Sequence, residues 1–247
     1  MGKNKLKKFA DLDSYNHVFQ VSFAEIDGKD FFMKGRWQED FFKNSNPVVL
    51  ELGCGKGEYT VGLARLFPDK NFIGIDIKGA RIHRGATDAI DEGLTNVAFI
   101  RTNIELITSF FRKGEVSEIW LTFPDPQMKK SRKRLSSTRF LKLYEDIMIG
   151  NGLIHLKTDS NFMYTYTREL LKINNIIPEV DEDDLYSSGF HGEILSIQTF
   201  YESKWLAHSL PIKYLRFRMP ENKTLTEPDV EIDFDDYHSA GRSVKRR

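Results

Sequence analysis

The first chemically informative feature is an aspartate held between two prolines and followed by a run of cations. Asp125 stands in the segment Phe123-Pro124-Asp125-Pro126, and the cations after it are Lys129, Lys130, Arg132, Lys133 and Arg134. Each proline fixes its own φ and restricts the residue before it, so the carboxylate of Asp125 is confined to a narrow range of directions. Cations this dense are excluded from an apolar core and must face water or a polyanion. An oriented acid beside such a strip indicates chemistry on a nucleic acid.

A second feature is the glycine-rich segment Glu51-Leu52-Gly53-Cys54-Gly55-Lys56-Gly57. Its glycines allow a sharp turn and a close approach of the backbone to a ligand, although a purely structural turn is the alternative. The dinucleotide fingerprint G-x-G-x-x-G does not fit, because its third glycine would fall at Glu58 or Thr60 in the two possible frames. The acids Glu51 and Glu58 would also repel a pyrophosphate.

The charge of these acids favours a cationic ligand. S-adenosylmethionine carries a sulfonium and an amino group, and a carboxylate beside the loop attracts both. Asp76 ends the next apolar run, where a carboxylate can accept hydrogen bonds from ribose hydroxyls. A cap on the following helix is the alternative for Asp76. The sequence therefore predicts S-adenosylmethionine as the cofactor, bound by Gly53, Gly55 and Gly57 together with Glu51 and Asp76.

Short apolar runs alternate with helical patterns from about residue 47 onward. The runs at 48–52, 72–76, 97–100, 119–123 and 153–156 predict strands, and the patterns at 59–67, 82–90, 104–112, 140–148 and 163–173 predict helices. Strands that are apolar on both faces and alternate with helices indicate a parallel sheet covered on both sides. Residues 212–219 alternate polar and apolar positions, which predicts a late antiparallel strand. The predicted fold class is α/β and Rossmann-like.

The ends of the chain differ from its middle. Residues 1–46 are interpreted as a basic N-terminal tail with an accessory element that is helical only around 34–43. Residues 47–220 form the predicted catalytic domain. Residues 221–247 are acidic and then basic, and such charge runs are typical of a poorly ordered tail.

The composition limits the other possibilities. The chain of 247 residues is 40% hydrophobic and has no formal net charge, so its total charge says nothing about partners. Cys54 is its single cysteine, which excludes an intramolecular disulfide and predicts the cytoplasm. The first residues lack the apolar core of a signal peptide, and no run of 18 apolar residues predicts a membrane span. The six histidines form no metal-binding pair, so no metal is expected.

With these motifs assembled, the chain resembles the bacterial tRNA (guanine-N7-)-methyltransferases, a family of class I S-adenosylmethionine-dependent enzymes. The resemblance extends from about Val48 to Met219 and is carried by the Phe123–Pro126 segment, by Leu156-Lys157-Thr158-Asp159 and by Thr199-Phe200-Tyr201-Glu202. It implies a mostly parallel, seven-stranded sheet with a late antiparallel strand and helices on both faces. It also implies methylation of N7 of a guanosine in the tRNA variable loop, at tRNA position 46.

The resemblance assigns roles by position. Glu51, Asp76, Asn103 and Asp125 match cofactor contacts, with Asp125 as the catalytic residue. The positions that match substrate contacts are Lys129, Asp159, Thr199 and Glu202. The RNA-contact strip would comprise Lys130, Ser131, Arg132, Lys133, Arg134, Leu135 and Ser136. Where the family often has Trp-Pro after the FPDP turn, this chain has Gln127-Met128, which removes an aromatic surface for stacking.

Simpler explanations exist for several of these residues. Asn103 and Asp159 each precede a predicted helix and can serve as its cap. Thr199-x-x-Glu202 has the form of a capping box. The expected partner is tRNA, with a monomer or homodimer and no obligatory protein partner. Two alternatives stay open at this point: an N-methyltransferase that acts on an exocyclic amine, and a non-catalytic RNA-binding protein of the same fold.

Overall fold

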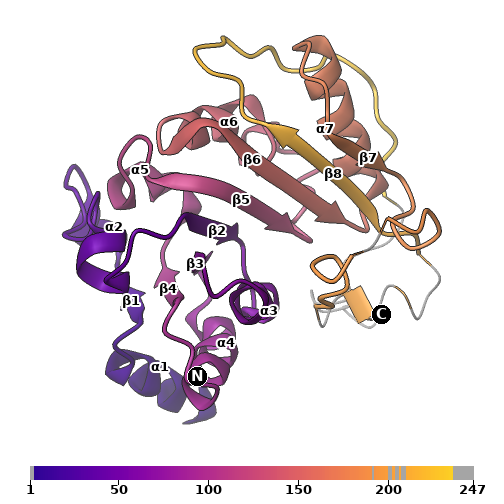
Figure 1. Ribbon diagram of the computed structural model, residues 1–247. Coiled ribbons are helices and arrows are strands. Elements are labelled where there is room, and N and C mark those ends of the chain that lie inside the picture. The colour runs from indigo at the N-terminus through magenta and orange to yellow at the C-terminus, as the bar shows by residue number, and fades with distance from the viewer. Residues whose placement is uncertain (1–2, 191, 200–201, 204–205, 207–209, 236–247) are drawn as a thin grey trace.

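The computed structural model describes residues 3–190, 192–199, 202–203, 206 and 210–235 (Figure 1). Within them, eight strands form one sheet in the order β1-β4-β3-β2-β5-β6-β8-β7. Their bounds are Val18–Gln20 (β1), Val48–Leu52 (β2), Asn71–Asp76 (β3), Val97–Arg101 (β4), Val116–Thr122 (β5), Met148–Thr158 (β6), Val180–Glu182 (β7) and Lys213–Arg218 (β8). Among these strands, β8 runs antiparallel to both of its neighbours, β6 and β7, and all the other pairs are parallel. The mostly parallel sheet with a late antiparallel strand is thus confirmed.

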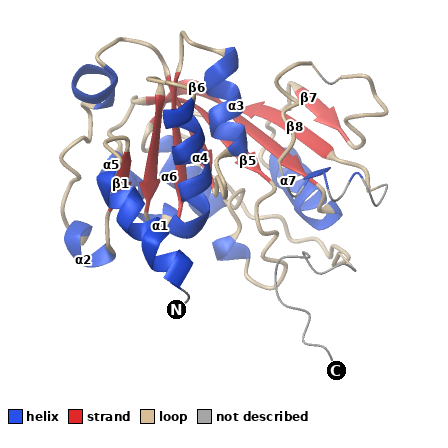
Figure 2. Ribbon diagram, turned by 90° about the horizontal axis from the view of Figure 1, so that it is seen from below, coloured by secondary structure: helices blue, strands red, loops and turns tan. Residues whose placement is uncertain are grey.

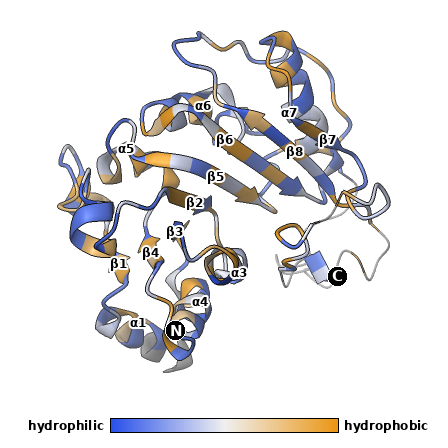
Figure 3. Ribbon diagram, in the orientation of Figure 1, coloured by the Kyte–Doolittle hydropathy of each residue, from blue (hydrophilic) through white to orange (hydrophobic). Residues whose placement is uncertain are grey.

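Helices cover both faces of the sheet, as the apolar strands predicted (Figures 1 and 2). One face packs against α1 (Lys3–Ser14), α3 (Glu58–Leu66) and α4 (Gly79–Asp91). The other packs against α5 (Ile107–Phe110), α6 (Thr138–Glu145), α7 (Asn161–Ile173) and the π-helix Trp37–Phe42. Strands β2 and β3 are buried along their whole length. Figure 3 shows hydrophobic residues along β2 and β4. Strands that are covered on both faces need apolar side chains on both faces.

The N-terminal region is more structured than its composition predicted. Residues 3–14 form α1, which packs against α4 and fully buries Leu12. The following strand β1 pairs with β4 and adds an eighth strand at the edge of the sheet, one more than the seven predicted. A strand of three residues is too short to show a hydrophobic period. The helix expected around 34–43 is present as the π-helix, and the indole of Trp37 donates to the Phe110 carbonyl at 3.0 Å.

The acidic C-terminal segment forms no helix or strand over residues 221–235, but it makes specific contacts. The Glu227 carboxylate accepts hydrogen bonds from the backbone N–H (2.9 Å) and hydroxyl (2.6 Å) of Thr138, at the start of α6. Asp235 accepts from the N–H of Phe162 at 2.9 Å, at the start of α7. Carboxylates at helix N-termini accept hydrogen bonds from free N–H groups and interact favourably with the helix dipole. The basic residues 236–247 lie outside the described residues.

Candidate active site

The predicted cofactor residues, Asp125 and Asp159 lie at or just after the carboxyl ends of neighbouring parallel strands. We call this part of the molecule the carboxyl edge. It comprises residues 51–57 at the end of β2, 76–78 at the end of β3, 102–103 after β4, 123–128 after β5 and 159 after β6. The loops are joined across the edge, since Gly53 N–H donates to the Ile75 carbonyl and Phe123 N–H to the Lys157 carbonyl, both at 2.8 Å. In open α/β sheets, ligands bind at this edge.

The three loop glycines differ in what a side chain at their position would contact. All have positive φ: 80° at Gly53, 58° at Gly55 and 74° at Gly57. A Cβ added to Gly53 or Gly55 would meet nothing closer than 3.9 Å, whereas one on Gly57 would lie 2.8 Å from the ring of Phe99. Gly57 therefore serves the packing of α3 against the sheet. The open sides of Gly53 and Gly55 are the cradle that a ligand can approach.

Glu51 is buried at the end of β2 and is held by two threonines. Its carboxylate accepts from the Thr60 backbone N–H at 2.8 Å and from the hydroxyls of Thr60 and Thr122. No ion pair with Glu51 occurs in the described part of the chain. Burial without a cation raises the pKa of Glu51 to about 7, an effect the hydrogen bonds from the threonines oppose. A cation brought beside it would favour the carboxylate form.

Asp76 and Asn103 combine local capping with a position at the edge. One oxygen of Asp76 accepts from Gly55 N–H at 3.0 Å and the other from Lys78 N–H at 2.7 Å, so this side chain fixes the glycine loop as well as the turn before α4. The Asn103 side chain accepts from Glu105 N–H at 3.2 Å and caps the 3₁₀-helix Ile104–Leu106. The capping role considered for Asn103 is confirmed, and its exposed side chain still lies at the carboxyl edge.

Asp125 is half-buried in a turn bounded by two unusual backbone conformations. Phe123 has φ 49° and Gln127 has φ 47°, the left-handed region that non-glycine residues rarely adopt. The Asp125 carboxylate accepts a hydrogen bond from Gln127 N–H at 3.2 Å. The two prolines made a constrained acid predictable, but the left-handed residues on either side were not visible in the sequence.

Asp159 does not cap the helix that follows it. Ser160 is the N-cap of α7, and its hydroxyl accepts from Met163 N–H at 2.9 Å. Asp159 is half-buried at the end of β6, close enough to Lys213 to act on it electrostatically. Burial lowers the pKa of Lys213, and the carboxylates of Asp159 and Asp235 oppose that change. The capping alternative is therefore wrong for Asp159, and its acidic side chain follows β6, the strand next to the one that ends in the FPDP turn.

Thr199 and Glu202 form the capping box considered from the sequence. Glu202 N–H donates to the Thr199 hydroxyl at 3.1 Å, and Thr199 N–H donates to the Glu202 carboxylate at 3.4 Å. Glu202 is completely buried, and it also accepts from the Lys157 ammonium at 2.7 Å and from the Tyr186 hydroxyl at 2.6 Å. Direct contact with a substrate is not available to this carboxylate in the described conformation.

Lys157 is the residue that sequence reasoning missed. Its side chain is completely buried, and besides Glu202 it donates to the carbonyls of Leu195 (2.6 Å) and Ile197 (3.3 Å). It thereby ties residues 195–197 and Glu202 to the end of β6. Desolvation lowers the pKa of Lys157, and Glu202 opposes that change. The available signal was a lysine directly after the apolar run at 153–156.

The basic strip divides into an exposed part and a buried part. The side chains from Lys129 to Lys133 are exposed, as expected of an RNA-binding strip. Arg134 is only 3% exposed and Ser136 only 1%, so neither can reach RNA in this conformation. Ser136 is bonded to the Thr167 hydroxyl at 2.7 Å, and Leu135 is half-buried. The predicted RNA contacts at Arg134 and Ser136 are corrected accordingly.

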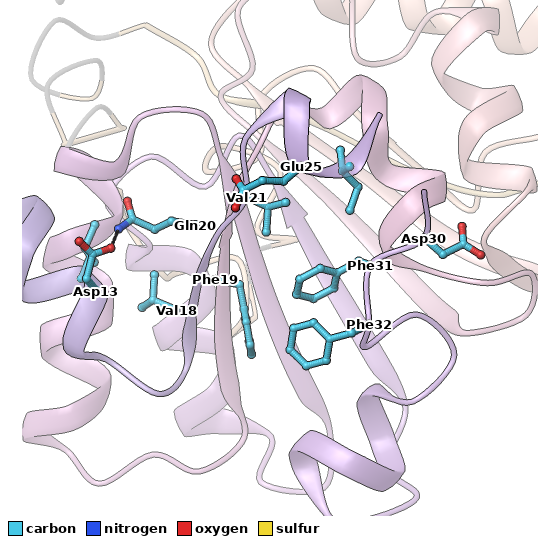
Figure 4. Close-up of a pocket in the computed structure, with 11 residues that line it drawn as sticks. Asp13, Val18, Phe19, Gln20, Val21, Glu25, Asp30, Phe31 and Phe32 are labelled. Carbon is cyan, nitrogen blue, oxygen red and sulfur yellow. Dashed lines mark hydrogen bonds between the residues drawn. The ribbon is translucent and has the colours of Figure 1, made fainter. Parts of the chain in front are cut away.

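A cavity of about 500 Å³ lies elsewhere, at the outer edge of β1, and contains none of the predicted site residues (Figure 4). Its apolar lining includes Phe19, Phe31 and Phe32. Its three acids are engaged locally: Asp30 pairs with Lys34 at 2.7 Å, Glu25 accepts from Ser22 N–H at 2.7 Å, and Asp13 accepts from the Gln20 side chain. The described residues contain no metal-binding group of three His, Cys, Asp or Glu side chains. Nor does any helix among them have the length and apolar character to cross a membrane.

Comparison with known proteins agrees with this geometry. A family model described as "Putative methyltransferase" matches residues 45–215. Two solved structures share the fold: an antibiotic-related methyltransferase (TM-score 0.54, 17% identity, 73% of this chain and 90% of that one) and a 16S rRNA methyltransferase (TM-score 0.53, 15% identity, 74% and 92%).

The sequence relatives are much closer. A tRNA (guanine-N(7)-)-methyltransferase from Bacteroides fragilis is 58% identical, over 99% of this chain and 97% of that protein. One from Porphyromonas gingivalis is 54% identical, over 94% of this chain and 97% of that protein. The chain therefore belongs to the tRNA (guanine-N(7)-)-methyltransferase family.

Proposed function

We propose that this protein transfers a methyl group from S-adenosylmethionine to N7 of a guanosine in tRNA, at position 46 of the variable loop. One observation carries the proposal: the constrained Asp125 turn lies at the carboxyl edge, and it is followed directly by the exposed cations Lys129, Lys130, Arg132 and Lys133. The first supplies a fixed negative group for chemistry. The second supplies a surface for an RNA backbone.

The residues present fit S-adenosylmethionine. Gly53 and Gly55 leave open space beside the loop backbone, as close approach of a ligand requires. Glu51 and Asp76 add negative charge without an ion pair in the described part of the chain, which suits a sulfonium and its amino group. We assign Glu51, Gly53, Gly55, Gly57, Asp76 and Asn103 to the cofactor, with Gly57 acting through packing.

The protein need not remove a proton from the nucleophile in this reaction. Guanine N7 has a free lone pair and no proton at neutral pH, so no general base is needed to activate it. Bound S-adenosylmethionine supplies the electrophilic methyl group. Methyl transfer moves a positive charge to the imidazole ring of the guanine, and Asp125 is proposed to orient the base and to stabilise that charge.

The remaining substrate residues are proposed to act either by direct contact or indirectly. Asp159 is proposed to accept hydrogen bonds from the N–H edge of the guanine, and Lys129 to contact a phosphate or the carbonyl oxygen of the base. Thr199 is also proposed to contact the substrate, and its hydroxyl accepts a hydrogen bond from Glu202 N–H at 3.1 Å. Glu202 acts indirectly, because its carboxylate is committed to Lys157 and Tyr186. The exposed residues Lys130 to Lys133 hold the tRNA backbone through counterion release.

The organisation of the chain follows from the same activity. Residues 47–220 would form the catalytic domain, tRNA would be the partner, and the protein would act in the cytoplasm as a monomer or homodimer without another protein.

The direct test is incubation of bulk tRNA with labelled S-adenosylmethionine, followed by nucleoside analysis. The expected product is 7-methylguanosine, and its mapped position is the variable loop. Label on an exocyclic amine would favour the alternative N-methyltransferase. Absence of S-adenosylmethionine binding in calorimetry would instead favour a non-catalytic RNA-binding protein.

A further inference from the structure

Arg134 is a buried cation inside a strip that otherwise faces solvent. Its residue is 3% exposed, while Lys130, Ser131, Arg132 and Lys133 are all exposed. Burial of a guanidinium is costly unless its donors are satisfied. The contacts that satisfy it therefore show what this side chain does.

The Arg134 guanidinium donates three hydrogen bonds to the turn at 126–128. Nε donates to the Pro126 carbonyl at 3.0 Å, and Nη2 donates to the carbonyls of Gln127 at 3.1 Å and Met128 at 3.3 Å. Three consecutive peptide groups are thus held by one side chain. The planar fork of arginine can do this, whereas the single ammonium of lysine cannot reproduce it.

The turn needs such support. Left-handed conformations cost a non-glycine residue roughly 1–2 kcal/mol, and both Phe123 and Gln127 adopt them. Gln127 is also the residue whose N–H donates to the Asp125 carboxylate at 3.2 Å. A side chain that fixes the peptide groups at 126–128 consequently fixes the donor that orients Asp125.

Arg134 is itself held from behind. Its guanidinium lies over the ring of Tyr166, 3.9 Å from the centroid, and 4.7 Å from that of Phe162, both on α7. The Tyr166 hydroxyl donates to Glu227 in the C-terminal segment. The same segment reaches the turn directly, because Asp235 N–H lies 3.3 Å from the sulfur of Met128. The guanidinium is therefore clamped between α7 and the turn.

We propose that Arg134 is a positioning residue for methyl transfer, which holds the turn at 126–128 so that Asp125 faces the target base, and that it is not an RNA contact. This inference rests on the proposed function for its activity readout. The clamp itself is a property of the fold and can be measured without substrate.

The test is Arg134→Lys, which keeps the charge and removes the fork, compared with Arg84→Lys. Arg84 is exposed on α4 and pairs with Asp88 on the same helix, so its replacement should leave activity unchanged. Arg134→Lys should lower kcat about 30-fold, with the KM for tRNA within twofold and the salt dependence of tRNA binding unchanged. Hydrogen exchange of the amides at 123–130 should become faster.

Three results would overturn the proposal. A raised KM for tRNA with a reduced salt slope and normal kcat would make Arg134 an RNA contact. Lower thermal stability with normal kcat per folded enzyme would make its role merely structural. Unchanged hydrogen exchange of the amides at 123–130 would show that Arg134 does not hold the turn. If wild-type protein fails to methylate tRNA while exchange still rises in Arg134→Lys, the clamp stands and the proposed function fails, so the two are separable.

Discussion

The two halves of the carboxyl edge use buried charge in opposite ways. In the cofactor half, after β2, β3 and β4, Glu51 and Asp76 accept from hydroxyls and backbone N–H groups, and the described residues place no cation against them. The substrate half follows β5 and β6 and includes residues 194–199 and 202–203. There the buried cations Arg134 and Lys157 hold the loops, and Lys157 neutralises Glu202.

The difference corresponds to what each half must bind. A half that receives a sulfonium gains from carboxylates whose charge is uncompensated, even though their burial costs stability. A half that presents a base to the methyl group gains from loops of fixed shape, and buried cations with several carbonyl acceptors provide that rigidity. Removing a cation from the substrate half should therefore damage structure, and removing an acid from the cofactor half should damage binding.

The largest effect on stability is expected from Lys157→Met. It leaves the Glu202 carboxylate buried without its cation, which should lower the free energy of unfolding by about 3–5 kcal/mol. The matched control is Lys34→Met, because Lys34 pairs with Asp30 at the surface and such pairs contribute about 0–1 kcal/mol. Urea denaturation of both variants measures the difference. Equal losses would remove the special role of the buried pair.

The largest effect on turnover is expected from Asp125→Asn. The substitution keeps the shape of the turn and removes the charge, so kcat should fall about 100-fold or more, comparable with the loss of one electrostatic group at other active sites. Affinity for S-adenosylhomocysteine should fall much less. Methyl transfer within twofold of the wild-type rate would contradict the role assigned to Asp125.

Substitutions of Gly55 and Gly57 distinguish a binding role from a packing role within the cofactor half. Gly57→Ala places a Cβ against Phe99 and should cost about 2–3 kcal/mol of stability through overpacking. Gly55→Ala meets open space, so it should cost about 1 kcal/mol through its positive φ while weakening cofactor binding more than tenfold. Thermal unfolding and calorimetry on the two variants check both. A reversed pattern would mean that Gly57, not Gly55, borders the cofactor.

A smaller and salt-dependent effect is expected in the exposed strip. The triple variant Lys130→Ala, Arg132→Ala, Lys133→Ala should weaken tRNA binding about tenfold at physiological salt, and the salt slope should fall by about 1 for each phosphate that is no longer neutralised. Replacing the exposed cations Lys29, Arg84 and Lys172 by alanine is the control, since they lie outside the strip. Equal slopes in the two triple variants would make the strip an ordinary solvated loop.

The sequence predicted the cofactor half better than the substrate half. Glu51, Asp76 and Asn103 each lie at or just after the end of a recognisable strand, and parallel strands bring their carboxyl ends to one edge. The burial of Arg134 was not predictable, because nothing distinguishes it from its neighbours in a run of cations. Its partners Phe162 and Tyr166 come from a distant helix and are joined to it only by folding.

Glu51 gives a pH-dependent signature of the cofactor half. Its pKa is raised from 4.5 to about 7 by burial, so the folded protein binds this proton more tightly than the unfolded chain. The contribution of Glu51 to stability is therefore greatest at low pH and decreases as pH rises from about 4.5 through 7. Glu51→Gln, which cannot ionise, should remove this part of the pH dependence of the melting temperature.

The most direct test of the charge division is the ratio of affinities for S-adenosylmethionine and S-adenosylhomocysteine, measured by calorimetry between about pH 6 and pH 8, on either side of the pKa of Glu51. The first ligand carries a sulfonium and the second a neutral sulfur, so ionisation of Glu51 should improve binding of the first by about fivefold to tenfold relative to the second. The ratio should be independent of pH in Glu51→Gln. A ratio that does not change with pH in the wild-type protein would contradict the account.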